Sequence, residues 1–402
     1  PIYLDVLLDI PTEQFYMAGL EFKLTKNNKA YYGVSPLYSD FAKHNKFKEK
    51  LEEAKFGFYD AMRYLATFLF LNKLFFLKSP SEKFLLIEDG GYIAPILNQR
   101  CLENKSLLEY CEEFWIECPI EFQNLSLKEF ILSRVIGTVE HTRNGFDRLL
   151  KVSGESNILA LTAYSIAISK EKSKEESKEV AYSILNAIEN TLHGLGKVIS
   201  KRKIMLLGSH GNIGTFLDKY LIGGRLHESN LDLIRVDLKI LSNEPFLYKA
   251  FTDVDNEEFL NVDLIIGVTG DSVLKQKNFE NWILNSKKPH LFLVSGSTKT
   301  VEFSDFIDWM NQLNSTTQPM IGSDIVKLEI SRILDPQTQM DLGGKIHFEF
   351  QYQDQMIEKS IYLLSDGSPI NFLFFGVPTE SMDPIISQLG LMGQRKHERA
   401  GR

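Results

Sequence analysis

The sequence predicts an α/β protein built around a doubly wound parallel sheet. Four short apolar runs alternate with helical stretches, and such runs are typical of strands that are buried on both faces. The predicted strands are residues 203–207, 231–236, 262–268 and 289–296. A glycine-rich segment, LLGSHGNIGTFL (206–217), joins the first strand to a helical stretch. In an open parallel sheet such a loop lies at the carboxyl edge, where ligands bind.

Segments on both sides of this block predict further elements. Residues 83–89 and 114–119 are expected to be strands of a separate α/β region. Residues 345–376 alternate with a period of two, which predicts a β-hairpin with YQDQ (352–355) at its turn. The most apolar stretch, 64–77, is too short to span a bilayer and is expected to form a buried helix.

A charged run separates the two regions. Residues 169–179 carry alternating signs, which suits either an exposed helix with i,i+4 ion pairs or a mobile loop before a helix. From Val180 to Leu195 apolar residues recur at helical spacing, and Gly194 and Gly196 close this segment. We therefore expect a domain boundary near Gly196.

Composition excludes several functional classes. The 402 residues include 45 basic and 53 acidic side chains, a net charge of −8, which disfavours nucleic-acid and membrane partners. The basic tail (395–402) is expected to be solvated. Cys101, Cys111 and Cys118 lack a zinc spacing, so no metal site is expected. We expect reduced thiols and a cytoplasmic location.

The glycine-rich segment is a variant of the dinucleotide fingerprint, with Gly208, Gly211 and Gly214 three residues apart. Glycine is required where a strand turns sharply, where backbone contacts a pyrophosphate, and where helix packs closely on strand. The helix from Ile213 onward would direct its N–H groups at the phosphates, and Asn212, just before it, is a further candidate cofactor residue. A tight turn with no ligand is the alternative.

Other residues in this region strengthen the nucleotide interpretation. Asp237 closes the next strand, where an acidic group accepts hydrogen bonds from the adenosine ribose. Its charge favours NAD over NADP, although Arg235 and Lys239 weaken that inference. Thr269 and Gly270, in the VTGD segment, end the following strand at the ligand-binding edge.

Five segments, taken in order, resemble the S-adenosylhomocysteine hydrolase family. They span about residues 84–378 and are LLIEDGGYIAPIL (85–97), GTVEHTRNGFDRL (137–149), VDLIIGVTGD (262–271), LVSGSTKTVEF (293–303) and LLSDGSPINFLFFGVPTES (363–381). Residues 1–83 match nothing in this pattern.

The resemblance implies a Rossmann-type doubly wound parallel sheet inserted into a discontinuous α/β substrate-type domain. The first part of that domain would be residues 1–195, the NAD-binding domain 196–344, and the return with the C-terminal tail 345–402. In that family, NAD oxidises a ribose 3′-hydroxyl so that the 5′ substituent can be eliminated. The implied partner is a nucleoside-like or other small substrate, and a homo-oligomer is a further expectation.

The resemblance also implies site residues. Thr142, Asn144 and Asn371 would contact the cofactor, and Asp89 and Glu140 are retained acids. His141 stands in place of the family's second glutamate. Several groups needed for hydrolysis are absent, because Ser297 and Val377 replace two family histidines and the segment that supplies the central lysine has no match.

Two main interpretations follow. In the first, the protein is an enzyme that retains NAD-dependent chemistry, with His141 as the base and Asp89 orienting it. In the second, it is a catalytically degenerate NAD-binding sensor or partner-binding protein. A simple hydroxy-acid dehydrogenase is a weaker third interpretation. The structural alternatives are that His141 caps the helix near Thr142 and that Asp89 only closes an Asp-Gly-Gly turn.

Overall fold

The computed structural model divides into two compact units, which are described separately. One unit comprises residues up to Ser169 together with Ile385–Arg402, and the other comprises Lys170–Pro384. The described residues are 47, 50, 53–54, 58–77, 83–225, 233–238, 247–248, 250–297, 301–352, 355–374, 376–377 and 379–400. Most of the unassigned segment 1–83 and the side chains of the basic tail lie outside this set. None of the described helices has the length and hydropathy needed to cross a membrane.

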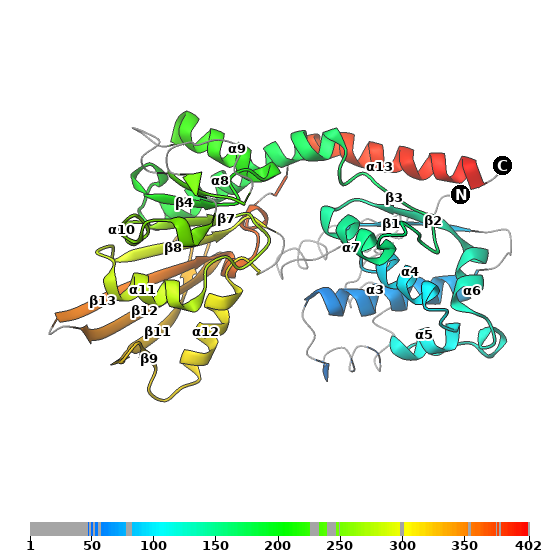
Figure 1. Ribbon diagram of the computed structural model, residues 1–402, viewed down its shortest axis with the longest axis horizontal. Helices are drawn as coiled ribbons and strands as arrows, with labels where there is room; N and C mark the ends of the chain where they lie inside the picture. Colours follow the sequence, from blue (N-terminus) through cyan, green and yellow to red (C-terminus); the bar gives the residue numbers. More distant parts are fainter. Residues whose placement is uncertain are drawn as a thin grey trace. The chain divides into compact units, whose positions relative to one another are not determined.

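The first unit contains a three-stranded parallel sheet in the order β1-β2-β3 and helices packed on it (Figure 1). Its elements are α3 (Phe58–Phe75), β1 (Phe84–Glu88), α4 (Ala94–Leu102), α5 (Leu107–Glu113), η2 (Ile120–Phe122), α6 (Leu127–Arg134), β2 (Val135–Glu140), α7 (Arg143–Ser153) and β3 (Ala163–Ser165). The predicted apolar helix is confirmed as α3, whose Leu71 and Leu74 are buried in the core.

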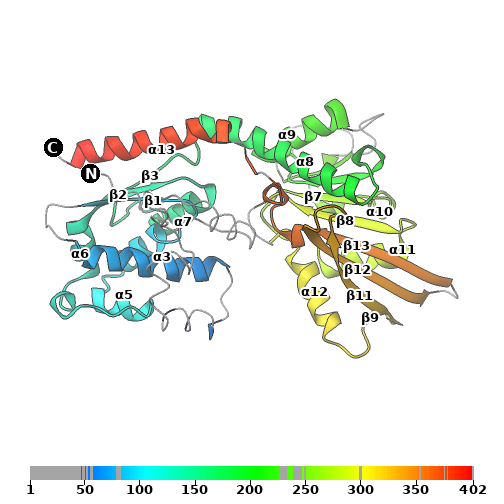
Figure 2. The same cartoon turned by 180° about the vertical axis from the view of Figure 1, so that it is seen from behind.

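The second unit contains an eight-stranded sheet (Figure 2). Its elements up to β7 are η3 (Glu171–Glu176), α8 (Ser177–Gly194), η4 (Ile199–Lys201), β4 (Ile204–Leu207), α9 (Asn212–Tyr220), η5 (Leu221–Arg225), β5 (Leu233–Val236), β6 (Leu247–Tyr248), η7 (Phe251–Asp253), α10 (Asn256–Leu260) and β7 (Leu264–Gly267). The remaining ones are α11 (Gln276–Asn285), β8 (His290–Ser295), α12 (Ser304–Asn314), β9 (Met320–Ile321), β10 (Asp324–Ile325), β11 (Lys327–Leu334), β12 (Asp341–Tyr352), β13 (Gln355–Leu364), η8 (Ser365–Gly367) and η9 (Ile370–Phe372). Helix α13 covers Thr379–Ala400.

Strand order confirms the predicted doubly wound parallel sheet. Six parallel strands run β6-β5-β4-β7-β8-β13, and numbering them along the chain gives the order 3-2-1-4-5-6 of the Rossmann fold. The order reverses between β4 and β7, so the loops that follow these two strands flank the crevice where such folds bind ligands. Antiparallel β12 and β11 extend the sheet beyond β13.

Alternate residues of β4 enter two different cores. Met205 and Leu207 pack with the residues of α11 and α12, whereas Ile204 and Leu206 pack with those of α8 and α9. Figures 1 and 2 show the two helix pairs on opposite faces of the sheet. All four β4 side chains are fully buried, which explains why this strand is a continuous apolar run.

The helical interpretation of the charged run also holds. Residues 171–176 form a helical turn that continues into α8, and Lys172 forms an ion pair with Glu176 at 2.5 Å. Helix α8 ends where the glycines indicated: Gly196 has φ +67°, and the N–H of Lys197 donates to the Leu192 carbonyl.

Two expectations differ from the structure. Residues 114–119 are not a strand: the N–H of Ile116 donates to the Cys111 carbonyl at the end of α5, Trp115 has φ +58°, and the apolar side chains reach the core from a loop. The chain passes from one unit to the other after Ser169 and after Pro384, whereas the expected domain boundaries were after residues 195 and 344. The hairpin belongs with the Rossmann sheet because β13 pairs in parallel with β8.

A substitution of Trp282 tests the packing of α11 against the sheet. It is fully buried, and its Nε1–H donates to the Val262 carbonyl at 3.0 Å. Replacing Trp282 with alanine is expected to lower the free energy of unfolding by about 3–5 kcal/mol, because it leaves a cavity and an unpaired carbonyl. Urea denaturation measures this loss. Lys277→Ala, at an exposed site of the same helix, should change stability by less than about 0.5 kcal/mol, and a similarly small loss for Trp282→Ala would contradict the packing.

Candidate functional site

The glycine-rich loop makes a tight connection between β4 and α9. Gly208 has φ +87°, a conformation that favours glycine. A Cβ atom on Gly214 would lie 1.9 Å from the Gly208 carbonyl oxygen, so a side chain there would collide with the backbone of the strand end. The N–H of Gly211 donates to the same carbonyl at 3.1 Å and closes the turn. These glycines bring the start of α9 directly against the end of β4.

The N-terminus of α9 carries no side-chain cap. Gly211 is the N-cap residue and Asn212, Ile213 and Gly214 form the first turn, so the first N–H groups lack a capping side chain. An uncapped helix start combines free donors with the positive end of the helix dipole, and it is a suitable place for phosphate oxygens. The residues present therefore fit a dinucleotide pyrophosphate.

Asp237 supports this loop from the end of β5. Its Oδ2 accepts a hydrogen bond from the N–H of His210 at 2.8 Å. Arg235, two residues earlier, is buried and directs its Nε–H to Asp218 at 2.8 Å. Arg235 is therefore engaged within the fold, while Lys239 lies outside the described residues. His210 contacts Ser209 through Nδ1 at 3.0 Å.

A second loop, after β7, is held by a buried carboxylate that sequence analysis missed. Glu302 is fully buried and accepts from the N–H of Gly270 at 2.6 Å and from the Thr269 hydroxyl at 3.0 Å. A Cβ atom on Gly267 would lie 2.5 Å from its Oε2. Burial raises the pKa of the Glu302 carboxyl. The sequence offers no signal for this contact, because a single glutamate in TVEF has no distinguishing spacing.

Asn371 lies at the same edge of the sheet. It is buried in η9, and its carbonyl accepts from the N–H of Gly376 at 2.8 Å. A bridge between Ser295 and Pro369 places this segment beside the end of β8. The structure thus brings together at one edge the predicted cofactor residues of the second unit, namely Gly208, Gly211, Asn212, Ile213, Gly214, Asp237, Thr269, Gly270 and Asn371.

In the first unit, two buried glutamates end neighbouring parallel strands. Glu88 on β1 is the register partner of Glu140 on β2. Glu88 accepts from the N–H groups of Ile93 and Ala94, at 2.6 and 2.8 Å, at the start of α4. Burial raises the pKa of Glu88 to about 8, and the charge of Glu140 adds to the rise. Sequence analysis did not select Glu88.

Glu140 is fully buried against the first turn of α7. Its Oε1 accepts from the backbone N–H and the hydroxyl of Thr142, at 2.7 and 2.8 Å, and from the N–H of Gly90 at 3.2 Å. Its Oε2 is buried and has no hydrogen-bond partner among the described residues. A Cβ atom on Gly145 would lie 2.1 Å from the Glu140 carboxyl carbon, so glycine is needed there. Burial raises the pKa of Glu140 as well.

His141 follows Glu140 and contacts Asp89. Its Nδ1 lies 3.0 Å from Oδ1 of Asp89, and its side chain is 11% exposed whereas that of Asp89 is 61% exposed. The helix cap is Thr142, whose hydroxyl accepts from the N–H of Gly145, so His141 does not cap α7. The predicted catalytic residues Asp89, Glu140 and His141 therefore lie together at the carboxyl ends of β1 and β2.

The loop that carries Asp89 is fastened by two side chains. Arg148 donates to the Gly90 carbonyl at 2.6 Å, and the Tyr59 hydroxyl donates to the Gly91 carbonyl at 2.8 Å. The guanidinium carbon of Arg148 also lies 3.5 Å from the centre of the Tyr59 ring, over which it stacks.

Thr142 and Asn144, which were predicted to contact the cofactor, belong to this first unit, whereas the glycine-rich loop belongs to the second. Among the described residues, no group of three His, Cys, Asp or Glu side chains could hold a metal ion.

Comparisons with known proteins find distant structural likeness. No family model matches the chain, and no curated protein matches it. A 2-hydroxyacid dehydrogenase from Ketogulonicigenium vulgare is 12% identical over 57% of this chain and 64% of its own, with a TM-score of 0.34. One subunit of dipicolinate synthase from Bacillus halodurans is 14% identical over 48% and 62%, with a TM-score of 0.28. An NAD-complexed D-isomer specific 2-hydroxyacid dehydrogenase from Lactobacillus delbrueckii is 14% identical over 46% and 56%, also at 0.28. The chain spans less than two thirds of the length of each.

The buried Glu88 makes stability depend on pH. Its pKa of about 8 in the folded protein exceeds the ordinary value of 4.5, so folding favours the protonated form. The contribution of Glu88 to the free energy of unfolding is then fully present below the unfolded-state pKa. It decreases as pH rises from about 4.5 to about 8, by on the order of 1.4 kcal/mol for each pKa unit. Glu88→Gln is expected to remove this fall, although its amide is a poorer acceptor for two N–H groups at any pH.

Chemical denaturation at several pH values tests this dependence. The slope of unfolding free energy against pH should be shallower for Glu88→Gln than for the wild type. Glu112→Gln, on α5, removes the same charge elsewhere in the unit and should keep the wild-type slope. Equal slopes in the wild type and Glu88→Gln would show that folding does not raise the pKa of Glu88.

Proposed function

We propose that this protein binds NAD and carries out NAD-dependent redox chemistry at a hydroxyl group of a nucleoside-like or other small substrate. The observation that carries the proposal is the glycine-rich loop, in which Gly208 and Gly214 allow the uncapped start of α9 to meet the end of β4. Thr269, Gly270 and Asn371 lie at the same sheet edge and would contribute further contacts to the cofactor.

The proposed cofactor is NAD rather than NADP. An acidic residue at the end of the second strand accepts from the ribose hydroxyls and repels a 2′-phosphate, and Asp237 occupies that position. Arg235, the nearby cation that could have favoured a 2′-phosphate, is paired with Asp218 at 2.8 Å. This engagement strengthens the preference for NAD.

His141 is the proposed base. An imidazole titrates near neutral pH, and the contact with Asp89 at 3.0 Å would orient its ring and stabilise its protonated form. A bound nicotinamide would supply the hydride acceptor that oxidation of an alcohol requires. Glu140 holds the turn before α7 through Thr142 and Gly90, so it would position His141.

The resemblance to the S-adenosylhomocysteine hydrolase family supports a nucleoside-like substrate. Ser297 and Val377 stand in place of two of its histidines, which argues against the complete hydrolase cycle. We further propose a cytoplasmic location and a homo-oligomer. All three cysteines are free thiols, which suits a reducing compartment.

A variant of Gly211 tests the cofactor. Its φ of −68° is open to any residue, but a Cβ atom there would lie 3.3 Å from the Gly208 carbonyl oxygen, a tight contact that requires a shift of a few tenths of an ångström, so circular dichroism and thermal unfolding verify that the variant is folded. Gly211→Val is expected to weaken NAD binding by at least tenfold, because the side chain occupies the proposed pyrophosphate space. Calorimetry measures the affinity, with NADP as the competing ligand.

Gly223→Ala is the matched control, since a Cβ atom there meets nothing within 4 Å. It should bind NAD like the wild type. Absence of NAD binding by the wild type, or unchanged binding by Gly211→Val in a folded protein, would contradict the proposal.

Variants of His141 test turnover. The NAD-loaded protein is incubated with nucleosides and hydroxy acids, and the absorbance of reduced nicotinamide is followed. His141→Ala is expected to lower kcat by about 10²–10⁴-fold while NAD affinity stays unchanged. Asp89→Asn should give a smaller loss, since Asp89 acts through the imidazole.

Two outcomes would revise this assignment. Wild-type turnover in His141→Ala would remove His141 from the mechanism. Tight NAD binding with no reduction across the substrates would favour the alternative function, a catalytically degenerate sensor or partner-binding protein.

A further inference from the structure

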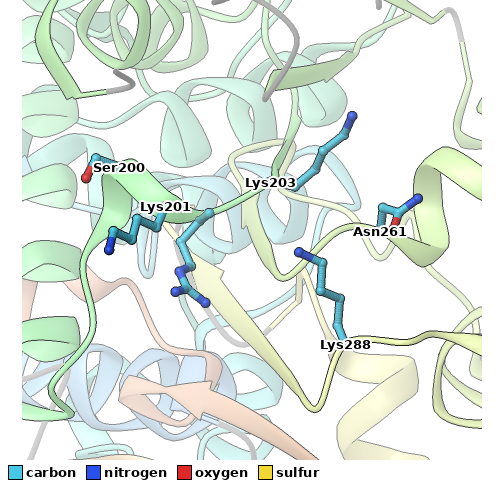
Figure 3. Close-up of a pocket in the computed structure, with 6 residues that line it drawn as sticks. Ser200, Lys201, Lys203, Asn261 and Lys288 are labelled. Atoms are coloured by element: carbon cyan, nitrogen blue, oxygen red, sulfur yellow. The ribbon is translucent and has the colours of Figure 1, made fainter. Parts of the chain in front are cut away.

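The amino edge of the Rossmann sheet carries a hollow of about 340 Å³. Its lining comes from three segments that lead into parallel strands: the one before β4, the one before β7 and the one before β8 (Figure 3). The lining residues are Ser200, Lys201, Arg202, Lys203, Asn261 and Lys288. Since the glycine-rich loop follows the carboxyl end of β4, this hollow lies at the opposite edge of the same sheet.

The lining is strongly cationic. Four of the six lining residues are lysine or arginine, and none of the six is acidic. One buried carboxylate lies behind them: Asp263 is 4% exposed and contacts Arg202 at 3.4 Å and Lys288 at 3.3 Å. Among the described residues that line or back the hollow, four cations against one carboxylate give a net charge of +3, in a chain whose total charge is −8.

Asp263 also restrains residues that line the hollow. Its Oδ1 accepts from the backbone N–H of Lys203 at 3.0 Å, and the same carboxylate holds Arg202 and Lys288. Cations on an ordinary surface are independent and solvated, but here a single buried anion ties two of them together from different loops. Their side chains lose less freedom on binding a ligand than unrestrained lysines would.

Positive charge extends to the neighbouring strands. His290, at the start of β8, has a buried Nδ1 with no hydrogen-bond partner among the described residues. Burial lowers the pKa of His290, and Lys197, Lys345, Arg202 and His347 lower it further.

We propose that this hollow binds a small phosphate-bearing anion. Arg202 uses its Nε–H on the Val198 carbonyl and its Nη1 on Asp263, and its Nη2 can donate to phosphate; the lysines supply point charges, and Ser200 and Asn261 supply neutral hydrogen-bonding groups. The volume is at the lower end of the roughly 300–1,000 Å³ typical of small-molecule sites, which suits a compact ligand. Because it is remote from the glycine-rich loop, the site does not depend on the proposed NAD chemistry.

Titration of the full chain with inorganic pyrophosphate tests the site. Lys201→Ala/Lys288→Ala is expected to weaken pyrophosphate binding by at least tenfold. Lys174→Ala/Lys277→Ala removes the same charge from exposed positions away from the hollow and should bind like the wild type. Circular dichroism and thermal unfolding verify that each variant is folded. If the double variant unfolds, the single variant Lys201→Ala replaces it, because Lys201 is exposed.

Gly211→Val separates this site from the glycine-rich loop. Pyrophosphate binding that persists in Gly211→Val and is lost in the lysine variant supports the proposal. Binding that is lost in Gly211→Val and kept in the lysine variant overturns it, as does absence of saturable binding. Orthophosphate and AMP as further titrants distinguish a site for free phosphate from one for a nucleotide. Binding of duplex DNA in preference to all three would also overturn the proposal.

Discussion

The close approach of Gly208 and Gly214 is the constraint on which the second unit depends. Only an absent side chain at Gly214 leaves room for the Gly208 carbonyl, and this contact sets α9 directly on the end of β4. The position of α9 in turn sets its uncapped N-terminus at the strand-order switch between β4 and β7. A larger residue at Gly214 would move the helix and with it every proposed phosphate contact.

Both units contain a buried glutamate that holds a glycine-containing loop at the ends of parallel strands. Glu140 accepts from the N–H of Gly90, and Glu302 accepts from the N–H of Gly270. Each carboxylate also lies where a neighbouring glycine leaves space, at Gly145 and Gly267 respectively. Burial raises the pKa of both groups, so their hydrogen bonds to backbone N–H groups offset a desolvation cost.

The two edges of the Rossmann sheet differ in how they would meet an anion. At the carboxyl edge the candidate donors are backbone N–H groups, which approach a ligand closely because the loop consists largely of glycine and small residues. At the amino edge they are long cationic side chains, two of which, Arg202 and Lys288, contact Asp263. Backbone donors suit a ligand of fixed shape, whereas lysine ammonium groups act as point charges and recognise charge more than shape.

The sequence by itself determined the elements whose residues share a local pattern. The apolar runs at β4, β5, β7 and β8 are buried on both faces, α8 follows helical spacing, and α3 contains the most apolar stretch of the chain. The glycines predicted the turn into α9 because a positive φ and a missing Cβ are properties of one residue type.

Only the tertiary structure decided what depends on distant contacts. Residues 114–119 have a strand-like composition, but they pair with no strand in the described part of the chain, and their apolar side chains enter the core from a loop. The hairpin β12–β13 joined the Rossmann sheet through its pairing with β8, a strand that lies far before it in the chain. Glu88, Glu302 and Asp263 became recognisable only once folding had buried them. Glu88 lies beside Glu140, and Glu302 and Asp263 accept hydrogen bonds from residues far away in sequence, so their environments are a property of the packed chain.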